Sequence, residues 1–169
     1  MAEEWLTERL LARPPRPEDR EGYRALFRDP AIQEWLRPAP LPPFSDEDIA
    51  ELLRGDEMHW EVNDFGPWAL IDRREGSLVG RGGLRWAEVE GRLIAELPWT
   101  IASARQGEGL ASEAAAAAIE WASKIEIDEL VALVRPENGA SLRVAEKAGL
   151  RCDREVLHAG LPHLAYLWP

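Results

Sequence analysis

The sequence predicts a mixed α/β domain, and three observations lead to this fold class. Apolar runs of strand length alternate with segments of helical periodicity along the chain. Short turn-like segments join the runs in the middle of the chain, as in an antiparallel sheet. The alanine-rich segment 110–124 has the composition of a helix that packs closely against a sheet. We therefore expect one domain over residues 1–169, and its 46% apolar residues suffice for a core.

The N-terminal part predicts one strand and three helical segments. Residues 5–13 read as the strand, and the proline-rich residues 14–17 end it. A helix follows over 18–27, because its first acids suit the positive end of a helix and its apolar residues form one stripe. The segment 32–53 predicts two short helices around a proline-rich loop, and a capping box at 45–48 starts the second. The loop fits either a lid or a stiff connector.

The middle of the chain predicts an antiparallel meander. Residues 67–86 contain two apolar runs, which the turn-like residues 74–77 join. A second turn at 90–91 leads into a further strand over 92–101.

The C-terminal part alternates between helix and strand. The helix over 110–124 is followed by a strand over 129–134, which Pro136 ends. A short helix over 138–149 and a last strand over 163–168 complete the pattern. With the two short helices of 32–53 counted as one helical segment, the predicted order is β-α-α-β-β-β-α-β-α-β, which is typical of one mixed α/β domain.

The charge balance argues against a nucleic-acid partner. The chain has 20 Lys and Arg against 31 Asp and Glu, and its formal net charge of −11 is opposite to the basic surface of nucleic-acid binders. An acidic surface attracts amines and basic peptides, although it also simply favours solubility. The first residues lack the basic and apolar parts of a secretory signal, and no apolar run approaches the ~18 residues of a membrane helix. We expect no membrane partner and a cytoplasmic location.

The single cysteine, Cys152, leaves no partner for an intramolecular disulfide. His158 and His163 are its nearest bases in sequence, but nothing else in the segment is typical of an activated nucleophile. We expect a structural cysteine at the start of a strand. Together with His59, these histidines lack the spacing of metal ligands, so no metal is expected.

A glycine-bearing loop between a strand and the helix over 110–124 carries most of the chemical information. Gly107 and Gly109 allow close approach of the backbone to a ligand, and the first helical turn offers unpaired N–H groups at its positive end. These features predict a cradle for a diphosphate. A Walker loop would need lysine where Leu110 stands, and a dinucleotide fold would need Asp128 after the next strand instead of before it. An ordinary glycine-containing helix start is the simpler alternative.

This loop and four other segments resemble a known family. QGEGLA at 106–111 matches the Q/R-x-x-G-x-G/A loop of the GNAT superfamily of N-acetyltransferases. The segments that match the order and spacing of its RimJ/RimL branch, which includes ribosomal-protein N-terminal acetyltransferases, are IQEWLRP, FSDEDIAELL, LVGRGGL, ELPWTIASARQGEGLASEA and NGASLRVAEKAGL. The resemblance covers nearly the whole chain. It implies the GNAT fold, with a mixed, mostly antiparallel central sheet of six to seven strands and helices on both faces. The family's fourth and fifth strands, here 92–101 and 129–134, would splay around the cofactor.

The resemblance implies acetyl-CoA as the cofactor, with CoA as product. The end of the fourth strand would line the pantetheine arm, the loop and helix start would hold the diphosphate, and the later helix start would contact the arm. In this sequence those positions are Thr100, Ile101, Ala102, Gln106, Gly107, Glu108, Gly109, Leu110, Ala111, Asn138 and Ser141. Pro98 agrees with this assignment, because proline cannot donate to a ladder and the family has a bulge there, although its usual residue is glycine.

Acetyl transfer to an amine needs a base, because an α-amine has a pKa near 8 and a lysine amine near 10.4. Glu96 matches a glutamate position of the family and is the expected base, or a carboxylate that orients the substrate or pairs with an arginine. Ser141 maps to the serine proposed as the acid in this branch, since Ala145 stands where many relatives have tyrosine. Asn138 and Ser141 equally fit a helix N-terminus. A backbone N–H within 99–101 would meet the oxyanion.

Three hypotheses for function follow. The first is acetylation of a protein or peptide N-terminal amine by direct attack in a ternary complex. The second is acetylation of a small amine, such as a polyamine, amino acid or antibiotic. The third is a CoA-binding regulatory module without turnover. Acceptor residues are expected within 32–58, which contains the lid-like loop, and within 156–164. Some of the eight tryptophans would line such a pocket, pack in the core or form a homodimer interface, among them Trp35, Trp60, Trp86 and Trp99.

Overall fold

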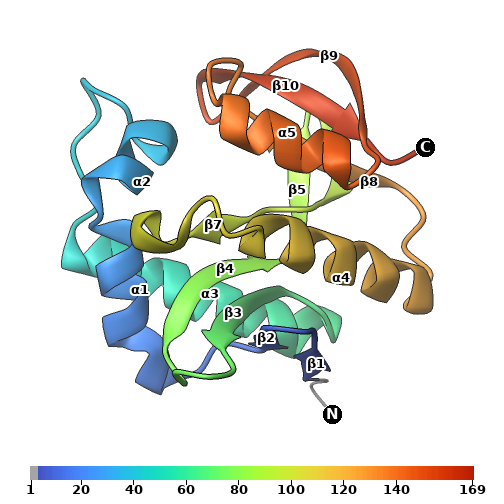
Figure 1. Cartoon of the computed structure of the whole chain (residues 1–169). Coiled ribbons are helices and arrows are strands. Elements are labelled where there is room, and N and C mark those ends of the chain that lie inside the picture. Colours follow the sequence, from blue (N-terminus) through green and yellow to red (C-terminus); the bar gives the residue numbers. More distant parts are fainter. Residues whose placement is uncertain (1–3) are drawn as a thin grey trace.

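A computed structural model describes residues 4–169, and their strands form two five-stranded sheets (Figure 1). The strands are β1 (Trp5–Leu6), β2 (Leu10–Arg13), β3 (Pro67–Asp72), β4 (Leu78–Gly83), β5 (Arg85–Val89), β6 (Arg92–Glu96), β7 (Thr100–Ile101), β8 (Leu130–Val134), β9 (Arg151–His158) and β10 (Leu161–Leu167). The helices are α1 (Arg20–Phe27), α2 (Pro30–Leu36), α3 (Asp46–Asn63), α4 (Leu110–Lys124) and α5 (Gly139–Lys147).

The two sheets have the strand orders β1-β2-β3-β4-β7 and β5-β6-β8-β10-β9. Neighbouring strands are antiparallel except for the parallel pair β6 and β8. Figure 1 shows α4 in front of the first sheet and α3 behind it, while α5 lies beside β8 and β10 of the second. The predicted mixed, mostly antiparallel α/β architecture with helices on both faces is confirmed.

The chain passes from one sheet to the other three times, so the predicted central sheet is divided; the last passage runs from β7 through α4 to β8. The first crossing is at Leu84, between β4 and β5, where Gly83 has φ +96° and an added Cβ would lie 2.9 Å from the Gly66 carbonyl oxygen. The second is at Leu97–Trp99, between β6 and β7. Pro98 lies at the second crossing, and its missing N–H explains why no ladder continues there. The position predicted for a bulge is therefore a break in the strand.

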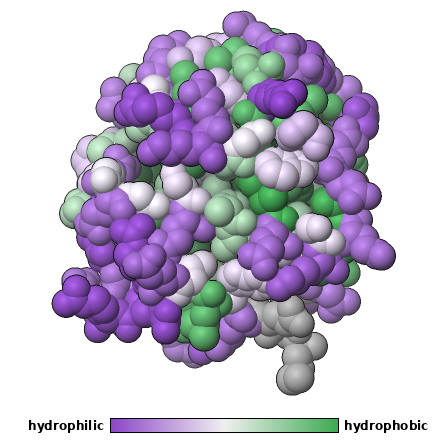
Figure 2. All heavy atoms as spheres, turned by 45° about the vertical axis from the view of Figure 1, so that its right-hand side comes forward, coloured by the Kyte–Doolittle hydropathy of each residue, from purple (hydrophilic) through white to green (hydrophobic). Residues whose placement is uncertain are grey.

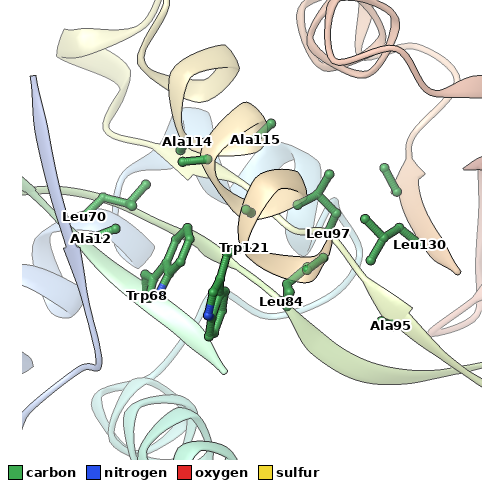
Figure 3. Close-up of a cluster of buried hydrophobic side chains, with 14 of the residues drawn as sticks. Ala12, Trp68, Leu70, Leu84, Ala95, Leu97, Ala114, Ala115, Trp121 and Leu130 are labelled. Atoms are coloured by element: carbon green, nitrogen blue, oxygen red, sulfur yellow. The ribbon is translucent and has the colours of Figure 1, made fainter. Parts of the chain in front are cut away.

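The main core lies between the first sheet and α4 and continues to the second sheet through residues such as Ala95 and Leu130 (Figure 3). Trp68 of β3 stacks on Trp121 of α4 with ring centroids 4.8 Å apart, and Trp60 of α3 also stacks on Trp121, with centroids 5.2 Å apart. The buried alanines of α4, such as Ala114 and Ala118, let the helix backbone approach the sheet closely. This packing fixes the start of α4 at the end of β7.

A second cluster joins the three N-terminal helices. Its buried members are Tyr23, Leu26, Phe27, Ile32, Ile49 and Leu53. Leu78 of β4 and Ala102 after β7 pack against this cluster. The helices α1, α2 and α3 are thereby attached to the first sheet beside the end of β7.

Hydrophilic side chains cover most of the face seen in Figure 2, and hydrophobic ones gather toward its middle and right-hand side. Within residues 4–169, no helix is long and apolar enough to cross a membrane.

Several predicted elements differ from the observed ones. Residues 5–13 form the short antiparallel pair β1 and β2 instead of one strand. The second helix of the 32–53 segment continues to Asn63, where Asp64 takes a left-handed conformation and ends it. The predicted order also omits β9, which forms a hairpin with β10. Cys152 lies in β9 and is exposed.

Candidate active site

A cleft opens where β6 and β8 stop pairing. Glu96 is in register with Val131, and the last hydrogen bond of the pair runs from the Leu97 N–H to the Val131 carbonyl at 2.8 Å. Beyond this point β7 pairs with β4, through Thr100 and Arg81, while β8 continues beside β10. The strands predicted to splay therefore do so, and a cavity of about 770 Å³ lies in and beside the gap.

Most of the predicted site residues meet in this cavity. Those that line it are Glu96, Thr100, Ile101, Gln106, Gly107, Gly109, Leu110, Ala111, Asn138 and Ser141. Two predicted residues do not. Ala102 packs against the N-terminal helices and its N–H donates to the Val79 carbonyl at 2.9 Å, and the Glu108 side chain turns to Arg105.

The glycine-bearing loop has a backbone conformation that glycine favours. Gly107 and Gly109 have φ of +83° and +85°, a region that favours glycine. An added Cβ at Gly107 would meet nothing within 4 Å, so the loop is open on that side. Gly109 is the N-terminal cap of α4, and the first intrahelical bond is the one from Glu113 N–H to its carbonyl at 3.1 Å. The N–H groups of the first turn are left for a ligand.

Two arginines that the sequence analysis did not single out brace this loop. Arg9 of the β1–β2 turn donates from its main chain and its Nε to the Glu113 carboxylate, both at 2.7 Å, and from Nη1 to the Glu108 carbonyl at 2.6 Å. Arg105 donates to Glu108 at 2.8 Å and to Asp72 of β3 at 2.8 Å. The backbone N–H groups of residues 74 and 75 together with Arg105 lower the pKa of Asp72 to about 2. The carboxylates thus stay ionised and hold the loop against the sheet.

Glu96 is a buried carboxylate at the root of the cleft. Its side chain is 8% exposed, and its Oε2 accepts a hydrogen bond from Arg85 Nε at 2.7 Å. This is the arginine pairing that the sequence analysis gave as an alternative to a base. The pairing uses one carboxylate oxygen, and no hydrogen bond among residues 4–169 is made to the other, Oε1.

Ser141 and Asn138 lie on the opposite side of the cleft, at the start of α5. The Asn138 Oδ1 accepts the Ser141 N–H at 3.2 Å, so its capping role is present. The Trp99 indole N–H points to Ser141 Oγ at 3.4 Å, which leaves the hydroxyl proton free to donate elsewhere. Ala145, at the family's tyrosine position, is fully buried and has no polar group to offer.

The cavity is also lined by polar groups to which the sequence analysis gave no role. His163 of β10 donates from Nδ1 to the Leu161 carbonyl at 2.9 Å, so its Nε2 lone pair is free when the ring is neutral. Burial lowers the pKa of His163, which favours that neutral form. His158 of β9 stands edge-on to it with centroids 5.5 Å apart. Both lie within the predicted acceptor region 156–164, but their role has no local sequence signal.

The cavity is basic although the protein is acidic. Its basic lining residues are Arg81, Arg85, Arg105, Arg135, Arg143 and Lys147, while Glu96 is the one acid that lines it among residues 4–169. The whole chain has a net charge of −11. A basic cavity beside an open glycine loop at a helix N-terminus fits the diphosphate of acetyl-CoA. The splayed gap, in which Ile101 and Asn138 line opposite walls, fits its extended arm.

The fold and this site define a class of protein, the acetyl-CoA-dependent N-acetyltransferases. Comparisons with known proteins agree. A family model described as the acetyltransferase (GNAT) domain matches residues 9–151. The Bacillus subtilis protein YkkB, whose function is uncharacterized, is 30% identical over 153 residues, and the match covers 88% of this chain and 87% of YkkB. The chain belongs to the GNAT acetyltransferase family.

Two solved structures show the same fold. An acetyltransferase from Agrobacterium tumefaciens is 24% identical with a TM-score of 0.84, and the match covers 100% of this chain and 95% of that one. RimJ from Mycobacterium smegmatis, solved in complex with CoA-disulfide, is 22% identical with a TM-score of 0.73, covering 94% and 81%.

Proposed function

We propose that this N-acetyltransferase acts on the α-amine of a protein or peptide N-terminus, and that residues 1–169 form its single catalytic domain. The observation that carries the proposal is the continuity of the cavity. It extends from the glycine-bearing loop past Glu96 to an apolar wall on the N-terminal helices, formed by Phe27, Ile32, Trp35, Leu36, Phe44 and Leu52. An N-terminal residue brings an amine and a side chain that such a wall can bury. A polyamine has no branch to place there.

The roles of the chain's own residues follow from the geometry. Acetyl-CoA supplies an activated acetyl thioester when bound. Thr100, Ile101 and the loop over 106–111 hold it. Glu96, through its unpaired Oε1, accepts a proton from the acceptor amine, directly or through water. Within residues 4–169, nothing accepts a hydrogen bond from the main-chain N–H of Trp99, which lies at the break between β6 and β7 and is available for developing negative charge.

An α-amine suits this base better than a lysine side chain. An α-amine has a pKa near 8, so about a tenth of it is already neutral at pH 7, whereas a lysine amine near 10.4 is almost wholly protonated. Ser141 holds a proton at Oγ that supports departure of the thiol, a modest contribution because a thiol has a pKa near 8.5.

The test is an acceptor panel. Purified protein is mixed with acetyl-CoA and either N-terminal peptides or small amines, and thiol release is followed together with the mass of the products. Peptides acetylated on the α-amine with higher kcat/KM than polyamines or aminoglycosides support the proposal. A preference for the small amines would replace it with the second hypothesis, and tight CoA binding without release from any acceptor would support the regulatory module.

A further inference from the structure

Arg135 stands out among the basic residues of the cavity because its guanidinium is largely buried and makes no hydrogen bond to a carboxylate. Arg143 and Lys147 have no ion pair among residues 4–169 either, but both are exposed. It follows β8 directly, lines the cavity and has a side chain that is 16% exposed. Its Nε and Nη1 are buried, and neither has a hydrogen-bond partner among residues 4–169. Its nearest acid is the exposed Glu137, 3.7 Å from Nη2 and beyond hydrogen-bond length.

The other buried or half-buried arginines of the cavity are paired with carboxylates. Arg81 makes two bonds of 2.6 Å to the buried Asp56, Arg85 makes its bond to Glu96, and Arg105 contacts Asp72 and Glu108. Arg105 Nη1 also lacks a hydrogen bond, but Nε and Nη2 of the same guanidinium are hydrogen-bonded to carboxylates, which is not the case for Arg135. A buried guanidinium N–H without an acceptor is costly, so the fork of Arg135 is poised for an acceptor group that a ligand brings.

The position of Arg135 places that ligand on the acceptor side of the cleft. Residues 131, 133 and 135 face the same side of the second sheet, because side chains alternate along a strand. Glu96 is in register with Val131 and shares this side. The pairing of Val134 with Leu164 brings Arg135 next to His163, and the Arg135 charge is one of the causes that lower the pKa of this half-buried histidine, after burial. The neutral ring does not compete for the same anion.

We infer that Arg135 binds a carboxylate of the acceptor, so that the preferred substrate carries both an amine and a carboxylate. Nη2 of Arg135 makes no hydrogen bond among residues 4–169 either, so it can pair with Nε or with Nη1 to present two parallel N–H donors to a carboxylate. Under the proposed function the carboxylate belongs to an acidic side chain close to the peptide N-terminus; the α-carboxylate of a free amino acid would be the source under the second hypothesis. This inference deepens the proposed function and depends on its acceptor site.

The test compares matched acceptors that differ only in charge. Free amino acids are set against their α-amides, and peptides with Asp or Glu near the N-terminus against the same peptides with Asn or Gln. The variants are Arg135→Met, Arg135→Lys and the control Arg151→Met, an exposed residue of β9 outside the cavity lining. Binding of the acceptors to CoA-saturated protein is measured by calorimetry, separately from turnover.

We expect the wild type to prefer the carboxylate-bearing member of a pair, and Arg135→Met to lower its kcat/KM and affinity about ten- to a hundredfold. In Arg135→Met, the kcat/KM for the neutral member of each pair and the affinity for CoA should stay at the wild-type values. The control Arg151→Met should behave like the wild type with both members, and Arg135→Lys should retain part of the preference that Arg135→Met loses. A preference confined to one kind of pair identifies the source of the carboxylate.

Two results would overturn the inference while leaving the proposed function intact. One is equal use of both members of every pair, unaffected by Arg135→Met. The other is an equal loss for all acceptors together with weaker CoA binding, which would make Arg135 a cofactor contact. If no acceptor is turned over, the proposed function fails, and the calorimetric arm still decides whether Arg135 selects a carboxylate.

Discussion

Substitution of Gly107 by alanine separates backbone strain from loss of the diphosphate cradle. Gly107 has φ +83° and an added Cβ would meet nothing within 4 Å. Gly91, at the turn between β5 and β6, has φ +78° and the same free space. An alanine in this left-handed region costs about 1–2 kcal/mol at either position. For a chain of this size each variant should therefore lower the Tm by about 2–8 °C.

Only Gly107→Ala should weaken CoA binding. The variant disturbs an N–H group placed for a charged oxygen, and a hydrogen bond to a charged group contributes about 1.5–3 kcal/mol, which corresponds to a loss of about ten- to a hundredfold in affinity. Calorimetric titration with CoA measures the affinity, and thermal unfolding without ligand measures the strain. Equal CoA affinity in the two variants would refute the assignment of the loop as the cradle.

The remaining predictions concern proton transfer and stability. Glu96→Gln should reduce kcat by about 10²–10⁴ with CoA affinity retained, and an unchanged pH profile of the residual rate would remove Glu96 as the base. Ser141→Ala should slow turnover while CoA affinity, measured by calorimetry, stays nearly intact; full activity would remove it as the acid. The stability that Asp72 contributes is fully present above its ordinary pKa of 3.8 and is lost as the pH falls toward about 2. In Asp72→Asn the midpoint of urea unfolding should therefore depend less on pH in this range than it does in the wild type. An identical acid dependence in the variant would contradict this. Asp56→Ala should destabilise the fold by about 3–5 kcal/mol in urea unfolding, because it leaves Arg81 buried without its partner, whereas a cost near zero would show that solvent reaches Arg81.

The site elements that could be predicted from the sequence are those set by local backbone chemistry. The glycine-bearing loop needs left-handed residues at 107 and 109, and glycine at both positions reveals it. The alanine-rich segment that packs as α4 and the capping box that starts α3 are equally local. Pro98, which lacks an N–H, also indicated an irregularity at this place, although we expected a bulge there and the structure has a break between β6 and β7.

Features set by tertiary contacts left no such signal. Most residues of β9 are exposed and polar on both faces, so no alternation marks the strand, and only the hairpin with β10 defines it. The change of sheet at Leu84 depends on how closely Gly83 approaches Gly66 in the fold. Arg9 braces the loop across 104 positions of sequence to Glu113. The unmatched fork of Arg135 is visible only once every neighbour is placed.

Hydrogen–deuterium exchange with and without CoA tests the central claim most directly, because it reports where on the backbone the cofactor binds. The account predicts slower exchange of the amides at 99–101 and 107–112 in the CoA complex, and no change at the turn around Gly91. Protection elsewhere on the molecule, with these amides unaffected, would contradict the assignment of the splayed strands as the cofactor site.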